Sequence, residues 1–301
     1  MTGDNTIDLD AAAAALQASP DYQVQRRLLV RELYGTPKPD EEVLTGIVLD
    51  TETTGFDSAM DHVIEICALP FTFSKEGCLF SVGTPYQALQ EPPQPLDPEI
   101  TKVTGLTDAD LAGQSINIED LEATIEPASL IIAHHAAFDR PFAERLSGAF
   151  EQKAWACSME DIDWNAEGIT SRKLEWIAYK LGFFFQGHRA VADCRAVLEL
   201  LSLLLPASES CGFEQLLETA RKPTIRFWAL NSPFEQKDTL KRRGYHWNSG
   251  EDGRRKAWYR DVTSLKAEQE ETWLTAEIYA GCGDRIDVTR ITAFERYSSR
   301  V

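Results

Sequence analysis

The sequence predicts an α/β protein in which helices flank a mixed sheet, followed by a second, smaller α/β domain. Three observations predict this class. Three strand-like segments come first, alternating helices and strands follow, and the character of the chain changes after Pro206. A length of 301 residues with 43% hydrophobic side chains is enough for about two domains and at least one sizeable core.

The first part of the chain is predicted to be a helical extension over residues 1–40. Residues 9–18 have helical composition, and residues 22–34 carry apolar side chains at helical spacing. Residues 46–49 then form a continuous apolar run, which is typical of a strand covered on both faces. The other elements expected up to Pro206 are strands at 62–73, 78–86, 129–134 and 154–158, and helices at 98–103, 117–125, 138–146, 172–181 and 190–205.

Beyond Pro206, residues 207–220 are predicted to be a linker, and residues 221–301 a small α/β domain. The elements expected there are strands at 224–230, 257–262 and 286–294, and helices at 233–243 and 265–280. Such a short region would have a thin core.

Composition narrows the function classes. A formal net charge of −18 argues on average against a partner as negative as nucleic acid, although an average does not exclude a local basic patch. The longest apolar run, residues 200–206, is too short to cross a bilayer, and the N-terminus lacks the basic region of a secretory signal. Six cysteines without a C-x-x-C pair indicate reduced thiols. We therefore expect a soluble cytoplasmic protein without a membrane partner.

Two carboxylates stand at the end of the first buried strand. Asp50 and Glu52 are two residues apart, so their side chains project from the same face of the strand. The two charges repel each other unless cations bridge their oxygens, and Mg²⁺ or Mn²⁺ prefers such ligands. Gly55 lets the backbone pass close to an occupant of the site.

Two further places carry candidate groups. Asp139 follows the apolar run 130–133 at the start of a helix, where a carboxylate could equally serve as an N-terminal acid favoured by the helix dipole. His188 lies in a loop five residues before Asp193, and this spacing alone also fits a loop histidine beside a helix cap.

Taken together, three motifs carry a resemblance. LDTETTGF at 49–56, HHAAFD at 134–139 and HRAVAD at 188–193 resemble, in this order, the exonuclease motifs of the DnaQ-like (DEDDh) 3′-to-5′ exonucleases. The resemblance implies an RNase H-like fold with a five-stranded mixed sheet over residues 41–206. It also implies two divalent metal ions, Mg²⁺ or Mn²⁺, held by Asp50, Glu52, Asp139 and Asp193, with His188 as the general base. Imidazole titrates near neutral pH, which suits that role.

The resemblance further implies a set of substrate contacts. Phe56 would meet the terminal base and Leu106 would be wedged between the last two bases, although both side chains could instead pack in a core. His134 could equally make structural hydrogen bonds, and His135 stands where the family commonly has Asn. The substrate-binding residues implied in this way are Thr53, Thr54, Gly55, Phe56, Thr104, Gly105, Leu106, His134, His135 and Phe138.

One region of the chain is basic, although the chain as a whole is acidic. Residues 221–260 hold eleven Lys and Arg against four acidic residues, and aromatic side chains are interleaved with the cations. Such a mixture holds single strands by stacking and phosphate contact. The alternative is that Trp247 and Trp258 form the small domain's core. The candidate nucleic-acid contacts are Lys241, Arg242, Arg243, Arg254 and Arg255. Residues 233–259 also resemble an accessory module that is found appended to DnaQ-like exonucleases.

The sequence thus predicts a metal-dependent 3′-to-5′ exonuclease that releases nucleoside 5′-monophosphates from a free 3′ end. DNA is favoured over RNA, with single strands or 3′ overhangs preferred. Two alternatives stay open: an exoribonuclease on short RNA, and a proofreading subunit bound to a polymerase. The absence of an evident polymerase-binding tail favours a stand-alone enzyme, and the oligomeric state is left open.

Overall fold

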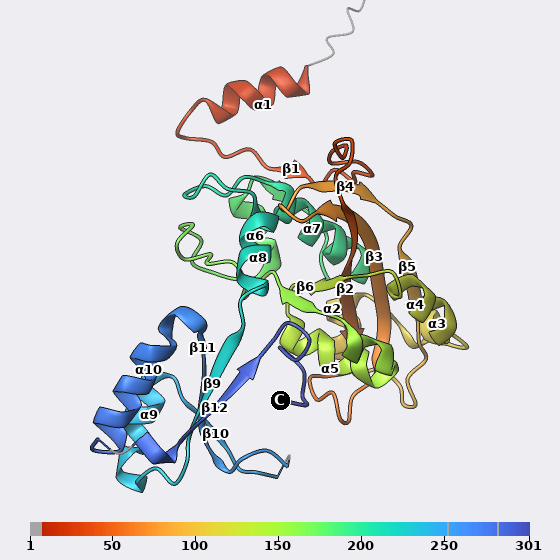
Figure 1. Ribbon diagram of the computed structural model, residues 1–301. Coiled ribbons are helices and arrows are strands. Elements are labelled where there is room, and N and C mark those ends of the chain that lie inside the picture. The colour runs from red at the N-terminus through yellow and green to blue at the C-terminus, as the bar shows by residue number, and fades with distance from the viewer. Residues whose placement is uncertain (1–7, 252, 282) are drawn as a thin grey trace, which may run out of the picture.

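The computed structural model describes residues 8–251, 253–281 and 283–301 (Figure 1). Its helices are α1 (Leu9–Gln17), α2 (Pro98–Thr104), α3 (Asp108–Leu111), α4 (Ile118–Ile125), α5 (Ala136–Leu146), α6 (Leu174–Lys180), α7 (Ala190–Ser202), α8 (Gly212–Ala220), α9 (Lys237–Arg243) and α10 (Ala267–Trp273). Its strands are β1 (Arg26–Arg27), β2 (Val43–Thr53), β3 (Val63–Ser74), β4 (Leu79–Val82), β5 (Tyr86–Leu89), β6 (Leu130–Ala133), β7 (Trp155–Cys157), β8 (Phe183–Phe184), β9 (Thr224–Ala229), β10 (His246–Asn248), β11 (Ala257–Thr263) and β12 (Ile286–Ile291).

The larger sheet is mixed and has the order β4-β3-β2-β6-β7. β3 is antiparallel to β2, whereas β6 and β7 run parallel to it. The expected strand 78–86 is divided into β4 and β5, which both pair with β3. Pro70 lies in β3 between the two pairings and has no N–H to continue the ladder. The expected five-stranded mixed sheet is confirmed, and β5 pairs with β3 as an additional short strand.

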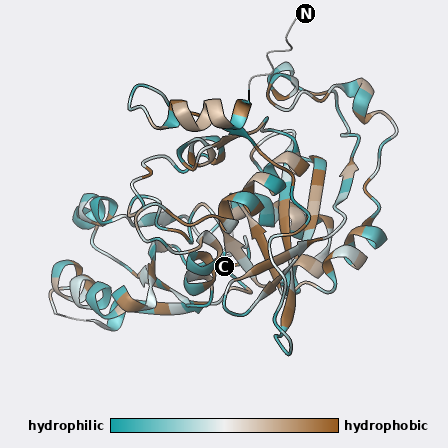
Figure 2. Cartoon of the chain, turned by 90° about the horizontal axis from the view of Figure 1, so that it is seen from above, coloured by the Kyte–Doolittle hydropathy of each residue, from teal (hydrophilic) through white to brown (hydrophobic). Residues whose placement is uncertain are grey.

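Helices cover both faces of this sheet. Ile47 and Leu49 of β2 pack in one core with residues of α4 and α5. Val48 points to the opposite face and packs in a second core with residues of α6, α7 and α8. The hydrophobic colour in Figure 2 is accordingly strongest on the central strands. This alternation also decides which way the polar residues at the end of β2 point.

The predicted helix at 22–34 is wrong. Arg26 donates its backbone N–H to Gly182 O at 3.1 Å, and Leu28 donates to Phe184 O at 2.8 Å, so the segment pairs with β8. Tyr34 then donates to Phe80 O at 2.6 Å. Free backbone groups at these edges give the segment the hydrogen bonds that a helix would otherwise supply.

The predicted linker at 207–220 is also corrected, because residues 212–220 form α8. Phe213, Leu216 and Leu217 are buried in the core that faces α7. The Phe213 ring lies 5.6 Å from the Phe71 ring and 5.2 Å from the Phe73 ring, both in T-shaped contact. The apolar face of α8, with the Phe213 ring, is thus part of the larger core.

The C-terminal region, residues 221–301, which is called the C-terminal domain below, contains an antiparallel sheet of the order β10-β11-β9-β12. Its core lies between the sheet and α9, α10 and the π-helical turn Leu274–Ile278, and includes Phe227, Leu240 and Tyr245. The expected helices and strands of this region are present, whereas β10 was not foreseen. The five cysteines in the described ranges are free thiols, as expected, and Cys282 lies outside those ranges.

Candidate active site

The candidate site lies at the end of β2, where three carboxylates converge. Asp50 and Glu52 lie on the side of β2 that faces α7, and α7 contributes Asp193 from its first turn. Ligand atoms of these three side chains all lie within 4.8 Å of one another. Segments almost 150 residues apart in the sequence therefore meet at one point, as the motifs predict.

Asp139 approaches from the opposite face of the sheet. It lies in the first turn of α5 and is 2% exposed. Its Oδ1 accepts hydrogen bonds from the Thr51 backbone N–H at 3.1 Å and from Thr51 Oγ1 at 2.8 Å. Thr51 lies between Asp50 and Glu52 in β2, and its side chain points to the opposite face of the sheet. Its hydrogen bonds therefore connect Asp139, on one face, with the strand that carries Asp50 and Glu52 on the other face. The structure thus places all four predicted carboxylates at one site.

The four carboxylates are buried or half-buried among like charges, and each has a raised pKa. Burial, with the charge of Asp139, raises the pKa of Asp50 well above its usual value. Burial and the charge of Asp193 raise the pKa of Glu52 to about 8. Burial raises the pKa of Asp139 to about 7 and the pKa of Asp193 to about 6. Such a cluster favours a positive occupant.

The donor set fits divalent metal ions. It consists of carboxylate oxygens, which are the ligands that hard cations such as Mg²⁺ and Mn²⁺ prefer. Asp50, Glu52 and Asp193 already lie close enough together to share an ion. The structure accordingly supports metal binding by this acidic cluster.

His188 lies in the loop before α7 with its side chain half exposed. Its φ of +62° is in the left-handed region, which costs free energy for a residue with a Cβ. Its Nε2 lies 3.6 Å from Oε1 of Glu175 on α6. Glu175 could not be predicted from the sequence, because only the packing of α6 beside the loop brings it close to His188.

An ion pair between a buried glutamate and a half-exposed arginine anchors this same loop. Glu65 of β3 is fully buried and lies opposite Glu52 in the β2–β3 register. It accepts hydrogen bonds from Arg189 Nε and Arg189 Nη2, both at 3.1 Å, and from the Ala190 backbone N–H at 3.3 Å. The Arg189 backbone N–H in turn donates to Asp193 Oδ2 at 3.1 Å. Sequence reasoning missed Glu65, whose role depends on strand register.

The turn after β2 forms one wall of the site. Thr53 Oγ1 donates to Gly55 O at 2.6 Å, and Thr54 Oγ1 to Asp61 Oδ1 at 3.3 Å, so both hydroxyls brace the turn. A Cβ at Gly55 would lie 2.4 Å from Asp61 Oδ2, which explains the glycine. The Phe56 side chain is 92% exposed, which does not fit the alternative of core packing.

Phe138 and His135 continue this wall from α5. The rings of Phe56 and Phe138 make an edge-to-face contact with their centroids 6.2 Å apart, and His135 stacks on Phe138 at 5.9 Å. His134 faces the interior, where its Nδ1 and Nε2 lie 2.8 Å from Ser158 Oγ and Arg172 O. Burial lowers its pKa to about 4. Both of its ring nitrogens are therefore used within the protein, which corrects its expected contact with substrate.

The expected opposite wall is changed. Leu106 is 3% exposed and packs with Ile64 and Leu111, so the expected wedge is a core side chain in this structure. Thr104 is buried and donates from Oγ1 to Ile100 O at 2.9 Å. Gly105 ends α2 with a φ of +72° and is exposed at the surface. Of these three residues, Gly105 alone remains available at the surface.

The candidate contacts in the C-terminal domain divide into two groups. Arg243 pairs with Glu270 at 3.1 Å, Arg255 pairs with Asp287, and Arg254 bonds the carbonyl of Val301. Lys241 and Arg242 are exposed on the last turn of α9, where Lys241 Nζ lies 5.9 Å from the centre of the Trp258 ring.

The two tryptophans of this domain also differ. Trp258 packs against the small core, whereas Trp247 is 50% exposed beside it, with ring centroids 5.6 Å apart. The surface of Lys241, Arg242, Trp247 and Trp258 is called the α9 patch below.

Comparison with known proteins gives the family. The family model described as Exonuclease (RNase T) matches residues 47–201, which include all five motif residues discussed above. A DNA polymerase III of the PolC type from Thermotoga maritima is 27% identical over 206 residues, which are 63% of this chain and 14% of that protein. The DNA polymerase III subunit epsilon of Treponema pallidum is 26% identical over 187 residues, covering 59% of this chain and 83% of the subunit.

The fold matches as well. The structure of E. coli exonuclease I in complex with a dT13 oligonucleotide superposes with a TM-score of 0.51, at 16% identity, over 73% of this chain and 63% of that chain. No helix in the described residues has the length and hydrophobicity needed to cross a membrane. With a matching family model over half of its length and the predicted acidic site in place, the chain belongs to the RNase T/DnaQ-like family of 3′-to-5′ exonucleases.

Proposed function

We propose that the protein releases nucleoside 5′-monophosphates from the free 3′ end of DNA, with single strands or 3′ overhangs preferred, and that it needs Mg²⁺ or Mn²⁺. The observation that carries the proposal is the convergence of Asp50, Glu52 and Asp193 within 4.8 Å, with Asp139 beside them. These four residues would hold two divalent ions. When bound, such ions neutralise charge on a phosphodiester and make water a better nucleophile.

The side chains have separate tasks in this proposal. His188 takes the proton of the attacking water, because its half-exposed ring stands on a loop at the rim of the carboxylate cluster. Glu175 faces its Nε2 and orients the ring. Phe56 and Phe138 offer aromatic surface for the terminal base, and the turn at Gly55 allows close approach of the sugar.

Two findings favour DNA as the substrate. The relatives reported above are DNA polymerase III proteins, and exonuclease I shares the fold in a complex with a DNA oligonucleotide. The α9 patch would add a second contact to longer strands, because it combines exposed cations with a half-exposed tryptophan.

A comparison of matched oligomers tests the substrate. DNA and RNA strands of one sequence, labelled at the 5′ end, are incubated with the protein in Mg²⁺ or Mn²⁺ as single strands, blunt duplexes and duplexes with a 3′ overhang. The proposal expects stepwise shortening of the DNA single strand and overhang. Faster shortening of short RNA would overturn it in favour of an exoribonuclease.

Replacing His188 tests the proposed base. His188→Ala removes the proton acceptor, and we expect kcat to fall by about 10²–10⁴ while KM changes little. Steady-state kinetics on a short DNA oligomer measures both constants. A variant with the parent's kcat would show that another group takes the proton.

A further inference from the structure

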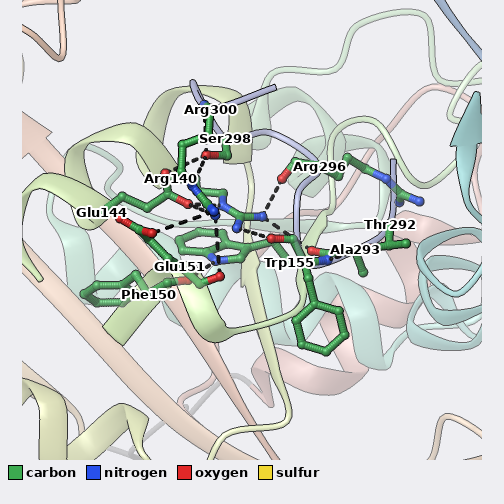
Figure 3. Close-up of polar contacts among 11 residues, drawn as sticks. Arg140, Glu144, Phe150, Glu151, Trp155, Thr292, Ala293, Arg296, Ser298 and Arg300 are labelled. Atoms are coloured by element: carbon green, nitrogen blue, oxygen red, sulfur yellow. Dashed lines mark hydrogen bonds and ion pairs between the residues drawn. The ribbon is translucent and has the colours of Figure 1, made fainter. Parts of the chain in front are cut away.

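The last residues of the chain return to the exonuclease body. After β12, the segment 292–300 contacts β7 and α5 of the exonuclease body (Figures 1 and 3). The Trp155 backbone N–H of β7 donates to Ala293 O at 2.8 Å. The segment thus occupies the free edge of the larger sheet beside α5.

Arg140 is the centre of this contact. Its side chain is fully buried, and it follows Asp139 directly in α5. Its guanidinium donates to Phe294 O and Arg296 O, both at 2.6 Å, and from Nε to Glu144 Oε1 at 2.7 Å (Figure 3). The Trp155 ring lies 5.4 Å below it. A weaker bond runs from Nη1 to Ala293 O at 3.4 Å, so three backbone carbonyls of the C-terminal segment accept hydrogen bonds from Arg140.

Side chains of the segment complete the network. Ser298 Oγ donates to Glu144 Oε2 at 2.7 Å, and Arg300 Nη2 donates to Glu144 Oε1 at 3.1 Å. Arg296 pairs with Asp161, which is itself buried, at 3.1 Å. A buried charge without partners is costly, so this network fixes the distance and orientation between the segment and α5.

We infer that the C-terminal segment 292–300 positions α5 through Arg140 and so sets the place of Asp139 in the active site. Asp139 has its described side-chain contact on the β2 side, with Thr51. Arg140, one residue on, holds the same turn of α5 to the segment. Because Arg140 and Asp139 are adjacent in the first turns of α5, a shift of the backbone at Arg140 would displace Asp139 as well, and misplacing a catalytic group by about 1 Å can cost about a hundredfold in rate.

This inference rests on the proposed function and extends it. Arg140 is a positioning residue, and part of what places Asp139 lies outside residues 47–201, the range matched by the family model. The exonuclease body is thus expected to depend on the C-terminal segment even for substrates too short to reach the α9 patch.

Two matched substitutions in the full chain test the inference. Arg140→Lys keeps the charge, but one ammonium group cannot replace the guanidinium fork. Arg226→Lys is the control, since Arg226 is also buried and makes a bidentate pair, with Asp261 at 2.7 and 2.8 Å, within the C-terminal domain. Three quantities are measured: Mn²⁺ binding by calorimetry without substrate, hydrogen exchange of residues 136–146, and kcat and KM on a short DNA oligomer.

We expect Arg140→Lys to weaken Mn²⁺ binding about tenfold, to speed exchange in α5 and to lower kcat by about ten- to a hundredfold with KM unchanged. Arg226→Lys should leave all three as in the parent. The double variant Ser298→Ala, Arg300→Ala, which loosens the network from the other side, should change them in the same direction but less.

Parental Mn²⁺ affinity and α5 exchange in both Arg140→Lys and the double variant would overturn the inference. Loss of Mn²⁺ binding in Arg226→Lys to the same extent would overturn it too, since the effect would then be one of general stability. A parent protein without nuclease activity would instead contradict the proposed function, while Mn²⁺ binding and hydrogen exchange would still decide the role of Arg140.

Discussion

At the scale of single residues, the active site is held together by contacts between neighbours of the catalytic groups. Thr51 stands between Asp50 and Glu52 and bonds Asp139. Arg189 stands beside His188 and bonds Glu65 through its side chain. Residues next to the proposed metal ligands and the proposed base therefore link the motifs to one another and to β3.

Crowding of the carboxylates leads to a prediction about stability. In Asp50→Asn one buried charge is removed from a cluster of like charges, so the metal-free protein should gain about 1 kcal/mol or more and melt at a higher temperature. The rise in Tm that Mn²⁺ gives the parent should be lost in the variant. Thermal scans with and without Mn²⁺ measure both effects, with Asp21→Asn at an exposed position as the control. A lower metal-free Tm would contradict the prediction.

Glu175 and His188 should act as a unit. Removing the carboxylate in Glu175→Gln leaves the imidazole less well oriented, and we expect kcat to fall several-fold. In the double variant with His188→Ala, the loss should equal that of His188→Ala alone, because the partner has already gone. A double-mutant cycle on kcat tests this, and additive losses would mean that Glu175 acts independently of His188.

Much of the site could be predicted at this scale, because Asp50, Glu52, Asp139, His188 and Asp193 sit in contiguous motifs. Glu65 and Glu175 could not, since strand register places one and helix packing the other. The same holds for Leu106, whose burial depends on contact with Ile64 from a distant part of the chain as well as with the nearby Leu111.

At the scale of elements, local periodicity predicted most helices and strands but not those segments whose structure depends on a partner. Residues 22–34 have helical spacing and yet pair with β8, because an open strand edge lies beside them. Residues 212–220 follow a proline and polar residues, a composition that indicates a linker. Their apolar side chains are nevertheless buried in the larger core.

Glu167 joins the loop before α6 to α8, and its contribution to the stability of the protein depends on pH. This buried residue of the loop before α6 accepts hydrogen bonds from the Ala207 and Ser208 backbone N–H groups at 2.8 and 3.1 Å, and from Gln215 Nε2 of α8 at 2.9 Å. These bonds lower its pKa to about 2, against burial, which acts in the opposite direction. Because the pKa of Glu167 is lower in the folded than in the unfolded protein, its ionised carboxylate stabilises the fold above about pH 4.5. This stabilisation is lost as the pH falls towards 2.

Glu167→Gln should therefore lower the free energy of unfolding by about 1–2 kcal/mol at pH 7, with a smaller difference at pH 3. Urea denaturation at the two pH values measures it. Glu218→Gln on α8, which breaks an exposed pair with Lys222 just beyond the helix, is the control and should change little. An equal difference at both pH values would show that the carboxylate charge is not the cause.

At the scale of the whole molecule, charge is unevenly distributed along the chain. Residues 221–260 carry a net +7, so the rest of the chain carries −25 and repels nucleic acid at long range. The structure reduces the number of cations in this region that are available for nucleic acid, because Arg243 pairs with Glu270 and Arg255 pairs with Asp287. The α9 patch, including Lys241 and Arg242, is then the part we propose for binding long strands.

Removing both exposed cations tests this proposal. In Lys241→Ala, Arg242→Ala, two phosphate contacts are lost, so binding of a long single strand should weaken and the slope of log K against log salt should decrease by about 1.4. Hydrolysis of a short oligomer should be unchanged. Lys75→Ala on the exonuclease body is the control, and an unaltered slope in the double variant would exclude the α9 patch as a binding surface.

The central claim is that four converging carboxylates direct hydrolysis from a 3′ end, and product analysis of one reaction tests it most directly. A single-stranded DNA oligomer with a distinct base at each end is incubated with Mn²⁺ and either the parent protein or Asp139→Asn, and the first mononucleotide released is identified by chromatography. We expect the 5′-monophosphate of the 3′-terminal nucleoside from the parent and none from Asp139→Asn. Release from the 5′ end, or equal release by Asp139→Asn, would contradict it.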